Sequence, residues 1–311
     1  MLYAFGPIPR GDAGSSSSIK QIYNPQIFST HWLHLLMEHL TSGQARELRT
    51  SHYLSLIYFT VLFYDYLLTF SAEVHFFWSR RRMSWPSVLF FLNRYGALLG
   101  HIPYMIGEFM HPSNEEVCSE IHRFYQIYVG LLQLVIFGLY VIRVSAIYNN
   151  SKLVVGYLVV VIVGSIALCC WFIASDARQG AHLLRGPGVT GCPQVYTHSQ
   201  GTRPALPWTG VLLFDSSIFV LTTAKAFRIG RQYPRSIISV LLRDGTLCFI
   251  VLFLVNLANI LTCLFAAPLL KSTNTLITTV MSNVAMSRMM LDLRAADEEL
   301  KLGDTGEIDY V

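Results

Sequence analysis

Residues 52–70 read HYLSLIYFTVLFYDYLLTF and decide the fold, because this apolar stretch is long enough to cross a lipid bilayer as a helix. A short link follows, with Glu73 and three consecutive arginines at 80–82. A second apolar stretch begins near Pro86. Together these features predict a membrane hairpin over residues 52–108.

Two charged residues interrupt the hairpin, Asp65 in the first arm and Arg94 in the second. At about 1.5 Å rise per residue, both lie at a similar depth. An ionised side chain near the bilayer centre costs roughly 2.5–3.5 kcal/mol, so such groups usually pair or face the bundle interior. We therefore expect Asp65 and Arg94 to pair or to share one polar network, with Glu73 meeting the arginines of the link. The network is either a structural clamp or a switch or ion site.

The composition of the whole chain is that of a helical membrane protein. Of its 311 residues, 53% are hydrophobic and 14% are charged, whereas soluble domains are about one quarter charged. The charges lie in short segments between long apolar runs, as in polytopic membrane proteins. The net charge of +4 comes from loop arginines. We expect the chain to contact a lipid bilayer and not nucleic acid.

Seven apolar segments predict an all-α transmembrane bundle, because lipid-exposed backbone must satisfy its hydrogen bonds within each helix. In the second segment, Gly100 and Pro103 predict a kink. The seventh is the weakest because it is rich in Thr, Ser, Asn and Met. The segments span roughly 52–72, 86–108, 121–143, 153–174, 208–227, 245–267 and 273–292.

The predicted domain organisation has three parts. Residues 1–51 form a polar tail, in which residues 31–40 are expected to form a short interfacial helix. Residues 52–294 form the seven-helix domain. Residues 295–311 form an acidic tail on the cytosolic side.

Basic residues in the loops predict the orientation. The loop after the second span has no Lys or Arg, and the loop after the sixth has only Lys271. The N-terminus is therefore expected outside and the C-terminus in the cytosol, in the plasma membrane by default. The loops after spans three and five are candidate surfaces for a cytosolic partner, although Arg143 is more simply a side chain that reaches the interface. The basic residues of the three inner loops are Arg80, Arg81, Arg82, Arg143, Lys152, Lys225, Arg228, Arg231, Arg235 and Arg243.

The cysteines fit this orientation. Four of the six lie inside apolar spans, and only Cys118 and Cys192 lie outside them, both on the predicted outer side. Disulfides persist on that oxidising side. We predict a Cys118–Cys192 bridge between the third span and the long outer loop, and the alternative is two free thiols.

The motif YDYLLTF at 64–70, followed by Glu73, Trp78 and LNRY at 92–95, resembles the N-terminal block of a family of basidiomycete fungal membrane proteins. That block, here about residues 52–97, is catalogued as a domain of unknown function. The resemblance implies a seven-helix integral membrane protein with no assigned activity.

Three later segments also resemble this family. They are RVSAIY at 143–148, Gly191 with Cys192, and SRMMLDLR at 287–294. The resemblance therefore extends over most of residues 52–294.

The first functional hypothesis is a receptor-like protein that senses an unknown ligand at its outer face. A candidate outer pocket comprises His101, Glu108, His122 and Asp215. Each has a structural alternative, such as ending a helix, meeting lipid headgroups or making a local hydrogen bond. The third span ends in Ile142-Arg143, without the acidic residue that rhodopsin-like receptors carry before this arginine.

The second hypothesis is a transporter or channel for an ion or small molecule. Asp65 and Arg94, together with Asp215, Asn256 and Asn259, are the groups that would line its polar path. Against it, the sequence shows no internal repeat and no paired broken helices. Asn256 and Asn259 are more simply explained as hydrogen bonds between helices.

The third hypothesis, a membrane enzyme, has little support. The sequence contains no HExxH, no GxSxG, no phosphate-binding loop and no zinc-type cysteine pair. His75, His101 and His122 lie too near span ends to bridge a haem, and no lysine lies deep enough in a span for a covalent retinal. We expect no enzymatic activity, no cofactor and no metal site.

Overall fold

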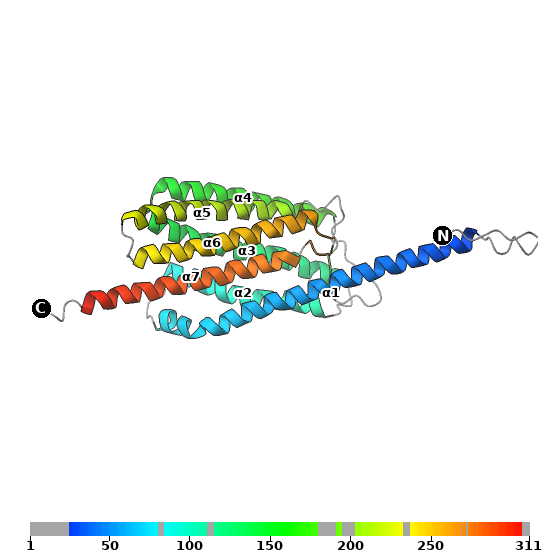
Figure 1. The fold of residues 1–311 in the computed structure, drawn as a ribbon, viewed down its shortest axis with the longest axis horizontal. Coiled ribbons are helices and arrows are strands. Elements are labelled where there is room, and N and C mark those ends of the chain that lie inside the picture. Colours follow the sequence, from blue (N-terminus) through cyan, green and yellow to red (C-terminus); the bar gives the residue numbers. More distant parts are fainter. Residues whose placement is uncertain are drawn as a thin grey trace, which may run out of the picture. The chain divides into compact units, whose positions relative to one another are not determined.

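The computed structural model describes residues 25–79, 84–110, 115–179, 191–194, 203–232, 237–267, 269–271 and 273–306. These residues form seven α-helices and one π-helix, which confirms the all-α prediction (Figure 1). The elements are α1 Pro25–Glu73, η2 Val74–Trp78, α2 Trp85–Phe109, α3 Glu115–Ile147, α4 Lys152–Gln179, α5 Ala205–Gln232, α6 Ile237–Phe265 and α7 Thr273–Gly306.

The chain divides into two compact units, Met1–Arg46 and Glu47–Val311. In the first unit, the described part is the beginning of α1. The backbone of residues 31–40 is helical there, but the side chains that would define an interfacial face lie outside the described residues. The second unit contains the rest of α1 and all the other helices.

Six of the seven apolar segments expected from the sequence lie within one α-helix each, and the sixth, 245–267, extends two residues past the end of α6 at Phe265. Several helices extend beyond the apolar run, because helix-forming polar residues continue them. α1 passes through the expected domain boundary at residue 52, and α7 continues to Gly306, well into the expected tail. An apolar pattern therefore locates these helices better than it locates their ends.

Five helical segments in the described part of the chain are long and apolar enough to cross a membrane. This indicates a membrane protein. α2 and α7 are not among the five, and both carry several polar residues that are buried inside the second unit. The five segments are Gly43–Trp78, Glu116–Ile147, Lys152–Asp176, Ala205–Arg228 and Leu247–Phe265.

The core of the second unit is built around α3, which packs against α2, α4, α5 and α7. Aromatic residues join α3 to α5 and to α6. The rings of Phe137 and Phe214 lie 4.2 Å apart, and those of Tyr140 and Phe249 lie 5.3 Å apart. Large apolar side chains on the outside, such as Leu153 at 86% exposure and Phe265 at 81%, suit contact with lipid.

Gly100 on α2 allows α3 to approach closely. A Cβ at this position would lie 2.0 Å from Cε2 of Tyr128, so a side chain there would collide with the ring. The Tyr128 hydroxyl reaches back to α2 and lies 2.8 Å from Nδ1 of His101. The absence of a side chain at Gly100 therefore leaves room for the Tyr128 ring and for this contact between α2 and α3.

A disulfide joins Cys118 to Cys192, with their Cα atoms 5.5 Å apart, and this confirms the predicted bridge. The backbone N–H groups of Gly191 and Cys192 donate to the carbonyls of Met110 and Gly107, each at 3.0 Å. Gly191 has a φ of +78°, and a Cβ there would lie 2.2 Å from the carbonyl oxygen of Glu108. The bridged segment is therefore fixed on the end of α2, at what we call the disulfide end of the second unit.

Candidate functional site

A buried ion pair joins α1 to α2 at the end of the second unit away from the disulfide. Nε of Arg94 lies 2.6 Å from Oε2 of Glu73, and the two side chains are 4% and 0% exposed. The Nε–H of Arg94 is not aligned for a hydrogen bond with this oxygen, so the contact is electrostatic. Nη2 of Arg94 donates to the carbonyl of Tyr66 at 3.0 Å, and its guanidinium lies 4.8 Å from the centre of the Tyr66 ring.

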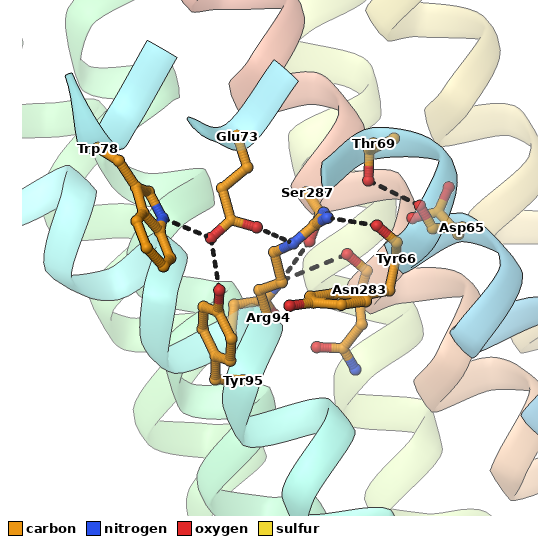
Figure 2. Close-up of polar contacts among 10 residues, drawn as sticks. Asp65, Tyr66, Thr69, Glu73, Trp78, Arg94, Tyr95, Asn283 and Ser287 are labelled. Carbon is orange, nitrogen blue, oxygen red and sulfur yellow. Dashed lines mark hydrogen bonds and ion pairs between the residues drawn. The ribbon is translucent and has the colours of Figure 1, made fainter. Parts of the chain in front are cut away.

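The π-helix that follows α1 contributes to this site. In η2 the backbone bonds connect residues five apart, and Trp78 is five residues after Glu73. Nε1 of Trp78 donates to Oε1 of Glu73 at 3.0 Å, and the Tyr95 hydroxyl donates to the same oxygen at 2.8 Å (Figure 2). The Glu73 carboxylate thus has two hydrogen-bond donors and one cation, as a buried charge requires.

Asp65 does not pair with Arg94, which corrects the pairing expected from the sequence. Its Oδ1 lies 2.5 Å from Nε of Arg288 on α7. The physical reason is helix rotation: Asp65 and Glu73 are eight residues apart, so their directions around α1 differ by about 80°. Asp65 therefore meets α7, whereas Glu73 meets α2. Any contact between Glu73 and the arginines at 80–82 lies outside the described residues.

Asp65 and Arg94 still border the same small cavity, together with Asn283 and Ser287 of α7. The cavity measures about 10 Å³, which is about the space that one water molecule needs. Beside it, Nδ2 of Asn93 donates to the Asn283 carbonyl and to the Ser287 hydroxyl, at 3.3 and 3.2 Å. Figure 2 shows these polar groups of α1, α2 and α7 close to one another, with Glu73, Arg94 and Tyr66 in one bonded set and Asn283 and Ser287 in another; we call them together the polar network.

A larger cavity of about 140 Å³ lies among α3, α4 and α5, toward the disulfide end. Its walls are mainly apolar and aromatic, and their polar groups are amides, hydroxyls, a thiol, one imidazole and one indole N–H. The lining residues are Tyr104, His122, Tyr125, Gln126, Val129, Gly130, Gln133, Leu134, Phe137, Ser165, Ile166, Cys169, Phe172, Ile173, Gln194, Pro204, Pro207, Trp208, Val211 and Thr275.

Of the four residues expected to form an outer pocket, His122 alone lines this cavity. Its Nε2 lies 2.7 Å from the carbonyl oxygen of Cys192, so the imidazole also holds the bridged segment in place. Glu108 lies at the same end, but it faces α1. Its Oε1 is 3.4 Å from the Ser55 hydroxyl and 3.9 Å from Nε2 of His52.

His101 and Asp215 are buried in the helix packing instead. Nδ1 of His101 lies 2.7 Å from the carbonyl of Ala97 and close to the Tyr128 hydroxyl, so this histidine is a hydrogen-bonded core residue. Asp215 accepts a hydrogen bond from Nδ2 of Asn256 on α6. The sequence pattern identified these residues as polar groups in apolar spans, but it did not give the side of each helix on which they lie.

The cavity is also lined by residues that were not among the site residues predicted from the sequence. Gln126 and Gln133 are seven residues apart on α3, or about two turns, so they share one face of the helix. Trp208 forms part of the wall from α5. Two amide side chains on one face of an apolar span could have been used to predict a polar cavity lining from the sequence.

Arg143 is buried rather than extended to the membrane interface. Its side chain is 7% exposed, and neither Nε nor Nη1 has a hydrogen-bond partner among the described residues. The expectation that this arginine serves as a surface anchor is therefore wrong.

The α1 and α2 residues of the polar network lie in a segment that matches a known protein family. Residues 53–99 match the model of a family of unknown function, DUF6533. The match includes Asp65, Glu73 and Arg94, and it confirms that residues 52–97 hold a recognisable family block. The fungal origin of that family and its seven helices stay predictions. No curated protein and no solved structure matches the chain.

Proposed function

We propose that the chain is a receptor-like membrane protein of a fungal plasma membrane, which senses a small molecule in the cavity among α3, α4 and α5. In this proposal all seven helices cross the bilayer, with the N-terminus outside and the C-terminus in the cytosol. The observation that carries the proposal is the cavity itself, because it lies at the disulfide end and disulfides form on the outer side of a membrane.

The cavity lining favours an uncharged ligand. None of the described residues that line it is Asp, Glu, Lys or Arg. Gln126, Gln133 and the other polar groups can give or accept a few hydrogen bonds, and aliphatic and aromatic side chains supply the rest of the lining. Small-molecule sites commonly have this composition. For scale, an engineered cavity of about 150 Å³ binds benzene.

The packing of α2 and α7 supports a seven-span arrangement. Both helices contact α3 and each other, so their polar side chains face protein rather than lipid. For example, Asn93 and Ser287 are 0% and 4% exposed and bond one another. Helices of this kind need less apolar surface to lie inside a membrane domain.

The transporter hypothesis has weaker structural support. Asp65 and Arg94 each have a charged partner, on α7 and α1 respectively. The space beside them is about 10 Å³, too small for a solute larger than water. A transport path at this network would require these ion pairs to separate, so a structural clamp is the simpler role.

Native Cys169 offers a direct test, because its thiol lines the cavity. Replacing Cys170, Cys248 and Cys263 with serine leaves Cys169 as the one free thiol beside the disulfide. A charged, water-soluble thiol reagent is added to intact cells and, separately, to inside-out vesicles. A receptor-like cavity predicts labelling from the outside alone. Labelling from both faces would favour a transporter, and no labelling from outside would contradict the proposal.

Two glycine variants test whether the reagent reaches Cys169 through the cavity: one fills the cavity and the other is the control. A Cβ on Gly130 would lie 3.6 Å from the Cys169 sulfur, so Gly130→Phe should fill the space beside the thiol and slow its labelling. Gly164 on α4 has open space around it. Gly164→Phe should therefore leave the labelling rate unchanged.

The same labelling assay then serves to find the ligand. A collection of small, uncharged, mainly apolar molecules is screened for protection of Cys169. A true ligand should protect the thiol in proportion to its occupancy, and Gln133→Leu should weaken that protection by removing an amide from the lining.

A further inference from the structure

Asp215 is a buried carboxylate without a counter-ion in the described part of the chain. It is 5% exposed and lies ten residues after the start of α5, about 15 Å along the helix. Nδ2 of Asn256 donates a hydrogen bond to its Oδ2. None of the described Lys, Arg or His side chains forms an ion pair with it.

Other buried oxygens near Asp215 have unused hydrogen-bonding capacity. Oδ1 of Asn256 and the hydroxyl of Tyr140 have no partner among the described residues, and the two side chains are 0% and 1% exposed. Tyr140 comes from α3, and its ring centre lies 6.3 Å from that of Phe214, the residue before Asp215. The buried Arg143, three residues after Tyr140, is the cation nearest to it on α3. Buried polar atoms nearly always have a partner, which can be a protein group, an ordered water or an ion, so these oxygens are available to bind a ligand beside the carboxylate.

The cluster lies next to the inner end of the cavity described above. Val211 lines the cavity and precedes Asp215 by four residues, so the two share a face of α5. Phe137 also lines the cavity and precedes Tyr140 by three residues on α3. A small ion in the cavity would therefore be about one helical turn from the carboxylate.

We propose that Asp215, Asn256 and Tyr140 bind a monovalent cation of the sodium type. Their donor atoms are a carboxylate oxygen, an amide oxygen and a phenol oxygen, and hard cations prefer oxygen ligands. One carboxylate balances one positive charge, which allows the buried group to stay ionised. A divalent ion fits less well, because the described residues bring no three His, Cys, Asp or Glu side chains together.

The test is the thermal stability of the purified full-length chain in detergent. Sodium chloride is raised from about 1 to 150 mM while choline chloride keeps the ionic strength constant. Binding to the folded state alone should raise Tm by about 3 °C and then saturate. Asp215→Asn should abolish this rise, and Tyr140→Phe should shift its midpoint to higher sodium concentration.

Asp176→Asn is the matched control, because this carboxylate on α4 accepts a hydrogen bond from Gln126 and lies outside the cluster. It should keep the full sodium response. An unmodified chain whose Tm does not respond specifically to sodium overturns the proposal, whether or not any variant folds. A stability that depends on pH but not on sodium would identify a protonated Asp215 instead. A sodium response that persists in Asp215→Asn would place the ion elsewhere. No ligand is added, so the result is independent of the proposed receptor role.

Discussion

Arg94 and Glu73 form a buried ion pair, with Nε and Oε2 2.6 Å apart, that fixes α2 against the last turn of α1. Both residues lie inside the segment that matches the family model, residues 53–99. Removing one partner leaves the other as an uncompensated charge in the protein interior. The pair is therefore the clearest target for stability measurements.

Arg94→Gln or Glu73→Gln should each lower the free energy of unfolding by about 3–5 kcal/mol, the usual cost of breaking one side of a buried pair. The double variant should lose much less than the sum of the two. Chemical unfolding of the purified protein in detergent gives the free energy of unfolding of the unmodified protein, the two single variants and the double variant. An additive result would contradict the pairing. As the comparison, the cycle of Asp65→Asn with Arg94→Gln should show a smaller coupling.

The ion pair between Asp65 and Arg288 should be weaker, because the Arg288 side chain is 49% exposed. Solvent screens such a charge, so we expect a coupling energy of about 1 kcal/mol between Asp65→Asn and Arg288→Gln. The same unfolding assay measures it. A coupling larger than that of Glu73 with Arg94 would show that the ranking of the two pairs is wrong.

The disulfide should contribute strongly to stability, because 74 residues separate its two cysteines. A loop of this length implies about 4 kcal/mol from the chain-entropy estimate. Cys118→Ser, Cys192→Ser and the double variant should all show the same loss, whereas Cys170→Ser, which removes an exposed free thiol, should have little effect. A non-reducing peptide map checks the linkage, and two freely alkylated thiols would disprove it.

Gly100→Ala should destabilise the protein by about 1–3 kcal/mol, because the added methyl group would overlap the Tyr128 ring. Gly164→Ala is the control, since it adds the same methyl group on α4 in open space. It should be neutral or stabilising by up to about 1 kcal/mol through helix propensity. The measurement is Tm in detergent, and equal shifts for the two variants would contradict the close contact.

The sequence predicted the features that depend on composition along the chain. Apolar runs located all seven helices, because each long helix of the domain contains an apolar segment. The disulfide was predictable because only Cys118 and Cys192 lie outside the apolar runs on the outer side. The polar network was detectable because Asp65, Glu73 and Arg94 are charged residues in or beside such runs.

The sequence could not predict which residues meet across helices. Residue spacing gives the depth of Asp65 but not the neighbour it faces, and its partner Arg288 is 223 residues away. The same limit explains why His101 and Asp215 were expected in an outer pocket that neither one lines. The walls of the cavity come from α2, α3, α4, α5 and α7, so their assembly depends on tertiary packing.

The most direct test of the receptor-like account is the topology of the chain in a membrane. Glycosylation or protease-accessible tags are placed at the N-terminus, near residue 233 between α5 and α6, and at the C-terminus. The account predicts an outside N-terminal tag and cytosolic tags at the other two sites. If both termini lie on the same side, then α2 or α7 does not cross the bilayer, and the seven-span receptor-like proposal is wrong.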